Sequence, residues 1–156
     1  MIDSPVGQLR LVERDGAITA IDFFPFTYAD GRPRGDRDDS SPVLLECARQ
    51  LAAYFAGELT DFDLPLAPVG TEWQRAVWGA LRTVPFGRTA TYGDIAHQLG
   101  KTNAAARAVG LANGQNPIPI VIPCHRIIGA DGSLTGYAGG IERKALLLDL
   151  ESDLLF

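Results

Sequence analysis

The chain has 156 residues, 46% of them hydrophobic, which suffices to bury a core as one domain or as two small ones. Its two cysteines exclude a disulfide framework, and no apolar run approaches the roughly 18 residues of a membrane span. No basic segment followed by an apolar run opens the sequence, as it would in a signal peptide. We therefore expect a globular, cytoplasmic protein without membrane association.

The formal net charge of -5 is unevenly distributed along the chain. Residues 1–70 carry six Arg against twelve Asp and Glu, whereas residues 71–126 carry six Lys and Arg against two acidic residues. A locally basic segment inside an acidic protein is compatible with binding phosphates on one face. An ordinary solvated surface gives the same pattern, so charge alone leaves the partner open.

The first part of the chain has the pattern of a hairpin followed by a helix. Apolar residues alternate or run on either side of Asp15-Gly16, which predicts two strands and a tight turn. Residues 27–41 are polar and predict a mobile loop. Ser41-Pro42 then supplies an N-cap and a first-turn proline for a helix that extends to Gly57 and packs on the hairpin. Cys47 lies in this helix, where we expect a structural thiol.

A proline-rich segment over residues 65–70 predicts a linker between a first domain over 1–66 and a second domain over 71–156. Thr71 and Gln74 have the spacing of a capping box before an apolar stripe that ends ahead of Pro85. Thr91 is expected to cap a short helix over 92–99, and Asn103 to cap another that runs towards residue 114. Two short helices joined around a glycine are typical of a helix-turn-helix, although many such pairs bind no nucleic acid.

The second of these helices is rich in alanine around a single long cation, Arg107. Such a slim face would allow close approach to a DNA groove, and an enzyme that acts on a base must first take that base out of the stack. Arg107 could then fill the vacant position. An alanine-rich helix that simply packs against its neighbour is about as good an interpretation of this segment.

Residues 122–126, Ile-Pro-Cys-His-Arg, place a thiol beside an imidazole. The thiolate is the nucleophile, so an ordinary cysteine with a pKa of about 8.5 needs a neighbouring base or cation to become reactive. His125 and Arg126 are the candidates for Cys124. Most free cysteines are small buried hydrophobes, so the dipeptide alone favours a structural cysteine.

The surroundings favour a reactive cysteine, because a collinear series of motifs extends over roughly residues 71–151. The motifs are Gln74 to Trp78, Pro85-Phe86-Gly87, Thr91-Tyr92-Gly93, Ala106 to Gly110, Asn116-Pro117, Ile122 to Arg126, and Gly136 to Gly140. This series resembles the O6-alkylguanine-DNA alkyltransferases, which repair alkylated guanine by moving the alkyl group onto their own cysteine.

The resemblance implies an α+β fold: an N-terminal ribonuclease-H-like α/β domain followed by a C-terminal winged helix-turn-helix domain that carries the active site. It implies DNA repair on double-stranded DNA, with O6-alkylguanine, and also O4-alkylthymine, flipped out before its alkyl group moves to Cys124. Transfer would be irreversible and stoichiometric, because a thioether is not hydrolysed under ordinary conditions. We expect a monomer, and cooperative binding along DNA stays open.

The resemblance also implies catalytic roles. Cys124 would accept the alkyl group, His125 would take its proton through a water molecule, and Glu151 would orient the imidazole. Tyr92 would donate a hydrogen bond towards N3 of the leaving guanine. Asn116 would tie the recognition helix to the active-site loop.

The residues implied to contact DNA or the flipped base form a second group. They are Arg107, Ala104, Ala105, Tyr137, Ala138, Gly139, Pro119 and Ile127. Arg107 would be the intercalating finger, and the backbone N–H of Ala138 would face O6. Position 138 is Ala where some relatives have Ser, and Trp73 stands where Phe is usual. Arg126 would be structural or face a phosphate rather than act in catalysis.

No cofactor and no metal are predicted. Some relatives bind a structural zinc in the N-terminal domain, but residues 1–70 offer only Cys47 and no His as nitrogen or sulfur ligands. One rival is a non-catalytic binder of alkylated DNA, resembling the alkyltransferase-like proteins, which have Trp in place of the cysteine; Cys124 argues against it. A cysteine hydrolase fits poorly, because hydrolases bring Cys and His together from distant segments.

Overall fold

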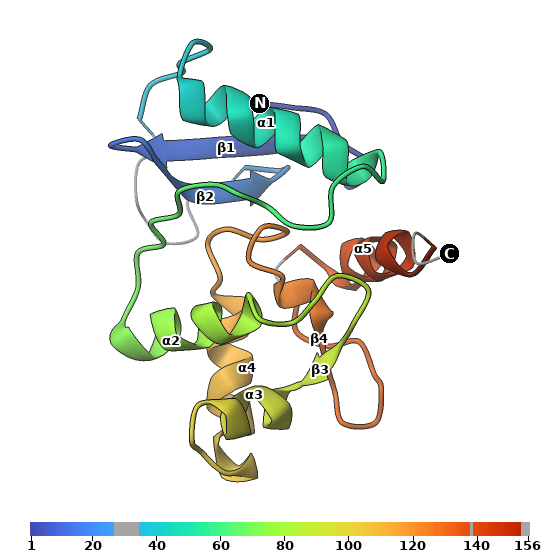
Figure 1. The fold of residues 1–156 in the computed structure, drawn as a ribbon. Helices are drawn as coiled ribbons and strands as arrows, with labels where there is room; N and C mark the ends of the chain where they lie inside the picture. Colours follow the sequence, from blue (N-terminus) through green and yellow to red (C-terminus); the bar gives the residue numbers. More distant parts are fainter. Residues whose placement is uncertain (27–34, 138, 154–156) are drawn as a thin grey trace. The chain divides into compact units, whose positions relative to one another are not determined.

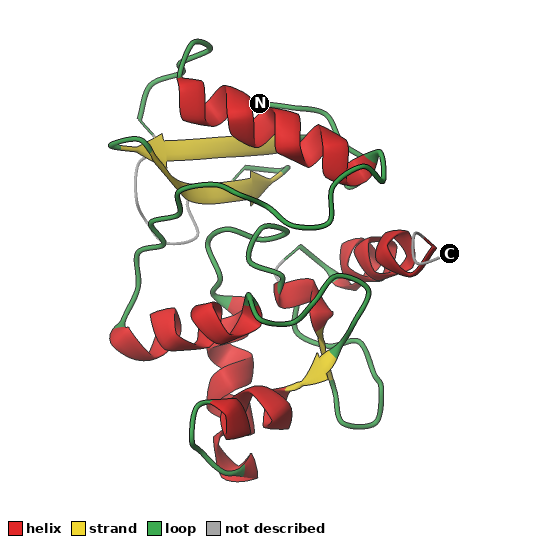
Figure 2. Ribbon diagram, in the orientation of Figure 1, coloured by secondary structure: helices red, strands yellow, loops and turns green. Residues whose placement is uncertain are grey.

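The computed structural model describes residues 1–26, 35–137 and 139–153, and it divides into two compact units, Met1–Pro68 and Val69–Phe156 (Figure 1). The first unit contains a two-stranded sheet and one helix. The second unit is mainly helical (Figure 2). All the predicted site residues belong to it.

In the first unit, strands β1 (Leu9–Arg14) and β2 (Ala17–Phe23) pair antiparallel, with Arg14 opposite Ala17. The turn between them has Asp15 at φ 52° and Gly16 at φ 82°, the positive values that a two-residue hairpin turn requires. The predicted hairpin is confirmed.

Helix α1 (Pro42–Phe55) packs on this hairpin, as the sequence predicts. The Ser41 side chain accepts a hydrogen bond from the Leu44 N–H, which confirms the N-cap. The helix buries Cys47, Leu51 and Tyr54. Burial raises the pKa of Cys47 to about 12, which fits the structural thiol expected there. Of the loop predicted to be mobile, residues 27–34 lie outside the described residues, and residues 35–41 are exposed apart from the Ser41 cap.

The proline-rich segment begins inside the first unit. The Ile18 N–H donates to the Pro65 carbonyl, and the Ala67 N–H donates to the Ile18 carbonyl, both at 2.8 Å. Residues 65–67 thus run alongside β2 as a short parallel partner of Ile18.

The second unit contains helices α2 (Glu72–Leu81), α3 (Tyr92–Gln98), α4 (Ala106–Gly114) and α5 (Ile141–Asp153). Capping boxes start α2 at Thr71 and α3 at Thr91, which confirms both expected helix starts. Two short strands, β3 (Ala90–Thr91) and β4 (Ile127–Ile128), pair in parallel; no sequence pattern predicted them.

The expected cap at Asn103 is wrong. Asn103 lies inside a 3₁₀ turn, Asn103–Ala105, that follows Thr102, and α4 begins only at Ala106. The Asn103 side chain faces the start of α3 instead, because a Cβ at Gly93 would lie 2.8 Å from the Asn103 Oδ1. The polar side chain therefore packs against a neighbouring helix and does not satisfy the first N–H groups of its own.

Trp78 holds α2 against α4 in the core of the second unit. Its side chain is 2% exposed, and its indole Nε1 donates to the Ala112 carbonyl at 2.9 Å. Val77, Leu81, Ile95 and Val109 are buried in the same unit. None of the helices in the described residues is long and apolar enough to cross a membrane.

Replacing Trp78 with Phe should destabilise the protein. The substitution removes a buried hydrogen bond and leaves space beside Ala112, so we expect the free energy of unfolding to fall by roughly 1–3 kcal/mol. Trp73→Phe is the matched control, because the hydrogen bond from the Trp73 indole to the Ala108 carbonyl is longer, at 3.4 Å, and is exposed to solvent. Urea unfolding followed by circular dichroism measures both. Equal losses in the two variants would contradict the role of Trp78.

Candidate functional site

Cys124 and His125 lie in a 3₁₀ turn, Cys124–Arg126, that leads directly into β4. Parallel pairing of β4 with β3 holds the end of this turn, with Ala90 opposite Ile127. The segment before the turn is buried through Ile118, Ile120 and Ile122. Ile120 has φ 74°, a strained conformation for a β-branched residue, so the surrounding structure must hold this loop in place.

Two asparagines hold the loop: Asn113 near the end of α4, and Asn116 just after that helix. The Asn116 amide donates to the Ile122 carbonyl at 2.8 Å and accepts from the Ile118 N–H at 3.0 Å. The buried Asn113 amide donates to the Cys124 carbonyl at 3.4 Å. Asn116 was expected to connect the helix to the active-site loop. Asn113 was not predicted to do so, because an Asn near a helix end usually indicates a turn.

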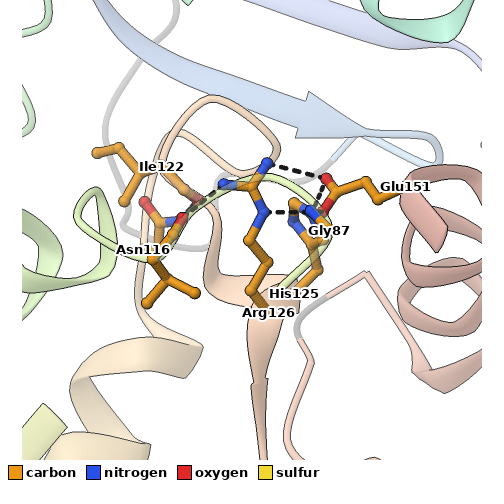
Figure 3. A network of polar contacts seen from close by, with 7 residues as sticks. Gly87, Asn116, Ile122, His125, Arg126 and Glu151 are labelled. Atoms are coloured by element: carbon orange, nitrogen blue, oxygen red, sulfur yellow. Dashed lines mark hydrogen bonds and ion pairs between the residues drawn. The ribbon is translucent and has the colours of Figure 1, made fainter. Parts of the chain in front are cut away.

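The predicted contact between the His125 imidazole and the Glu151 carboxylate is present. His125 Nε2 donates to Glu151 Oε2 at 2.7 Å, and the two side chains are 0% and 1% exposed (Figure 3). Glu151 comes from α5, far along the chain from the 3₁₀ turn. The resemblance thus predicted a contact that no local pattern could show.

Arg126 approaches the same carboxylate. Its Nε donates to Glu151 Oε1 at 2.8 Å and its Nη2 donates to Oε2 at 3.0 Å (Figure 3). Its Nη1 donates to the Val84 carbonyl at 2.8 Å. The guanidinium also lies 5.7 Å from the centre of the Phe86 ring. Of the two alternatives left open for Arg126, the structure supports the structural one, because this side chain is buried and does not face outward to a phosphate.

These contacts determine the charges of the pair. Burial alone would raise the pKa of Glu151, yet hydrogen bonds from His125 and Arg126 hold it at about 2, so the group is a carboxylate. Burial lowers the pKa of His125, and its attraction to Glu151 opposes that effect without overcoming it. A neutral imidazole that donates through Nε2 has its lone pair on Nδ1. Nδ1 is buried and has no hydrogen-bond partner among the described residues.

Cys124 is 3% exposed, and burial raises the pKa of its thiol to about 11. A hydrogen bond from the Asn116 side chain and the charge of Lys144 act in the opposite direction. The expected cation, Arg126, is engaged by Glu151, and Lys144 takes its place. In the resting protein the sulfur therefore carries its proton, and a base must remove it during a reaction.

Lys144 was not found from the sequence, although a signal for it exists. It precedes Glu151 by two helical turns on α5 and therefore lies on the same face as that carboxylate. The side chain is 0% exposed, and its Nζ donates to the Ile127 and Thr135 carbonyls. Burial lowers its pKa, and the proximity of Cys124 opposes that shift.

The other predicted pocket residues surround this centre only in part. Tyr92, the first residue of α3, places its hydroxyl 3.2 Å from the Thr135 carbonyl and 3.1 Å from Thr135 Oγ1. Tyr137, Pro119 and Ile127 are buried, and Gly139 is half-buried. Ala138 lies outside the described residues.

Three of the residues predicted to contact DNA lie at or just before the start of α4, the end opposite Asn113. Arg107 is exposed in the first turn of this helix, with Ala104 exposed and Ala105 half-buried in the 3₁₀ turn before it. Asn113 lies six residues further along the helix, or about 9 Å along its axis. One short helix therefore connects an exposed cation to the loop that holds Cys124. Among the described residues, no group of three or more His, Cys, Asp or Glu side chains is placed to hold a metal ion.

Two family models together match almost the whole chain. Residues 1–68 match the 6-O-methylguanine DNA methyltransferase ribonuclease-like domain, and residues 72–153 match the 6-O-methylguanine DNA methyltransferase DNA-binding domain. These matches and the mixture of helices and strands confirm the expected fold class.

Curated proteins and solved structures of the same family are also similar to this chain. The methylated-DNA--protein-cysteine methyltransferase of Mycolicibacterium paratuberculosis is 52% identical over 150 residues, covering 96% of this chain and 89% of the relative. A protein of the same name from Methanosarcina acetivorans is 46% identical over 155 residues, covering 97% of this chain and 96% of the relative. The crystal structure of Mycobacterium tuberculosis OGT in complex with DNA superposes with a TM-score of 0.90 at 49% identity, covering 98% of this chain and 91% of that one. The chain belongs to the 6-O-methylguanine DNA methyltransferase family.

Proposed function

We propose that this protein repairs double-stranded DNA by transferring the alkyl group of O6-alkylguanine, and of O4-alkylthymine, to its own Cys124. The observation that carries the proposal is a buried thiol next in sequence to a histidine whose ring is held by a buried carboxylate, inside the part of the chain that matches the family's DNA-binding domain. The relatives named above are methyltransferases that act on a protein cysteine, and one is solved in complex with DNA.

The transfer is a displacement at the alkyl carbon. The Cys124 thiol gives its proton to His125, whose unpartnered Nδ1 is the available acceptor, directly or through one water molecule. The sulfur bonds to the alkyl carbon, the bond from that carbon to O6 breaks, and its electron pair stays with the guanine. The base gains the one proton that the thiol lost and leaves neutral. The thioether is not hydrolysed, so each molecule reacts once.

Charge in the pocket assists both ends of this displacement. Glu151 stabilises the imidazolium that forms on His125, and the charge of Lys144 stabilises the developing thiolate. The Tyr92 hydroxyl exchanges its Thr135 partner for N3 of the leaving base. Tyr137, Ala138 and Gly139 form the pocket wall, with Pro119 and Ile127 beside them.

The base reaches this pocket by flipping out of the duplex. Arg107 inserts into the stack in its place, and the small side chains of Ala104 and Ala105 allow the helix to approach the groove. We assign the active site and the DNA contacts to a winged helix-turn-helix domain over 71–156, after a linker over 65–70 and a first domain over 1–66. The protein acts as a monomer in the cytoplasm, where a reducing environment keeps both cysteines free.

Intact-protein mass spectrometry tests the transfer. After incubation with a duplex that contains O6-methylguanine, the protein should gain one CH2 unit, because a methyl group replaces the thiol proton. Cys124→Ala should gain nothing. Cys47→Ala is the matched control, since the buried Cys47 belongs to the first unit and should leave the gain intact.

Peptide mapping should place the added mass on the peptide that contains Cys124. Tight binding of the damaged duplex by the wild-type protein without any added mass would favour the non-catalytic binder and contradict the proposal.

A second substrate tests the role of Arg107. We expect Arg107→Ala to slow repair of O6-methylguanine in duplex DNA by about tenfold or more, because extrusion costs a few kcal/mol and the side chain offsets part of that cost. The reaction with free O6-benzylguanine needs no extrusion and should be unchanged. Arg82→Ala, which removes another exposed cation, is the control for a general loss of charge. Equal slowing of Arg107→Ala on both substrates would exclude an intercalating role.

A further inference from the structure

Arg126 makes an unusually complete set of contacts for a residue with no direct part in the transfer. Each of its three guanidinium nitrogens donates a hydrogen bond of 2.8–3.0 Å, two to Glu151 and one to the Val84 carbonyl. The side chain is buried, like the Glu151 and His125 side chains beside it. Figure 3 shows the guanidinium and the imidazole approaching one carboxylate together.

We propose that Arg126 is a positioning residue for the transfer: by holding both oxygens of Glu151, it keeps His125 a neutral imidazole that donates through Nε2 and leaves Nδ1 to accept the thiol proton. This inference rests on the proposed function, since it concerns how the base in that reaction is prepared. Arg126 acts through Glu151 and does not touch the reacting atoms.

The first step of the argument is a balance of charge. The ionisable groups around His125 are Glu151 and Lys144 on α5 and Arg126 and Cys124 in the 3₁₀ turn. Glu151 alone would draw a proton onto the imidazole, because a buried carboxylate stabilises an adjacent cation. The charge of Arg126 already neutralises that carboxylate, and both Arg126 and Lys144 oppose a second cation on His125. The imidazole therefore stays unprotonated until the thiol proton arrives.

The second step concerns geometry. The planar fork of Arg126 contacts Oε1 through Nε and Oε2 through Nη2, so it fixes the plane of the Glu151 carboxylate. The third bond, to Val84, fixes the fork itself. Besides Arg126 and His125, Glu151 receives the Gly87 N–H at 3.5 Å. A lysine at position 126 would keep the charge but could not reproduce the fork.

The experiment separates these two effects. The chain has two histidines, so the His97→Gln background, which alters an exposed residue at the end of α3, leaves His125 as the single imidazole for NMR. The ring resonances of His125 are titrated over about pH 5 to 8 with Arg126 intact, with Arg126→Met and with Arg126→Lys. The rate of benzyl transfer from O6-benzylguanine is measured over the same range.

In Arg126→Met, we expect the titration midpoint of His125 to rise by about one pH unit or more, because the imidazolium gains an unshared carboxylate. The unprotonated base is then depleted at the acidic end of this pH range, so benzyl transfer should slow there by up to about tenfold and recover as the pH is raised. Arg126→Lys should keep the midpoint near that of the unaltered protein and lower the rate at every pH. If Arg126 had a merely structural role, Arg126→Met would lower the rate without moving the His125 midpoint or the pH dependence of the rate.

The inference is overturned if the His125 midpoint stays in place in a folded Arg126→Met protein, or if it moves equally in Arg126→Lys. Arg126→Gln, which keeps a hydrogen-bond donor without the charge, answers the same question if the Met variant does not fold. Failure of the unaltered protein to take up the benzyl group would instead refute the proposed function, while the His125 titration would still decide the role of Arg126.

Discussion

The carboxylate of Glu151 is the constraint on which the second unit depends. A buried charge without partners is costly, so the chain must bring donors to it from several segments. His125 and Arg126 come from the 3₁₀ turn, the Gly87 N–H comes from the loop after α2, and Glu151 itself comes from the last helix. Folding cannot satisfy one of these contacts without positioning the other segments, so the same interaction that docks α5 also orients the imidazole of His125, the residue next to Cys124.

This constraint explains why Cys124 can be both protected and reactive. Burial keeps its proton on the sulfur, which suits the proposed role of a residue that reacts once and must not be consumed by other electrophiles. In the proposed reaction, His125, Asn116 and Lys144 supply the base, the hydrogen bond and the charge that favour the thiolate when a substrate is present. Helix α4 connects this centre to the proposed DNA contacts, because Arg107 lies at its start and Asn113 lies near its end.

Local sequence patterns predicted the hairpin and the helix starts at Ser41, Thr71 and Thr91. They succeeded there because a turn or a cap depends on a few neighbouring residues. The cap at Asn103 failed, because its side chain packs against Gly93 of another helix. The two-residue pairing of β3 with β4 is too short to leave a period in the sequence.

In the candidate site too, local sequence patterns could not predict contacts between distant segments of the chain. The pair of His125 and Glu151 was expected only through the resemblance, because 26 positions of chain separate the two residues. Arg126 was recognised as structural or phosphate-facing without its partner, since nothing local links it to Glu151. Lys144 was missed altogether, although its spacing from Glu151 on α5 would have placed it on the same helix face. Burial, which determines the charges of these groups, depends on the tertiary structure.

The ionisation of Glu151 tests this account most directly. With its carboxyl carbon labelled and assigned, the resonance of Glu151 can be followed by NMR from neutral pH down to acid unfolding. A group shared by Arg126 and His125 should stay ionised throughout the folded range, in keeping with a pKa of about 2. A titration in the folded protein near the ordinary value of about 4.3, or above it, would show that the carboxylate is not held as described.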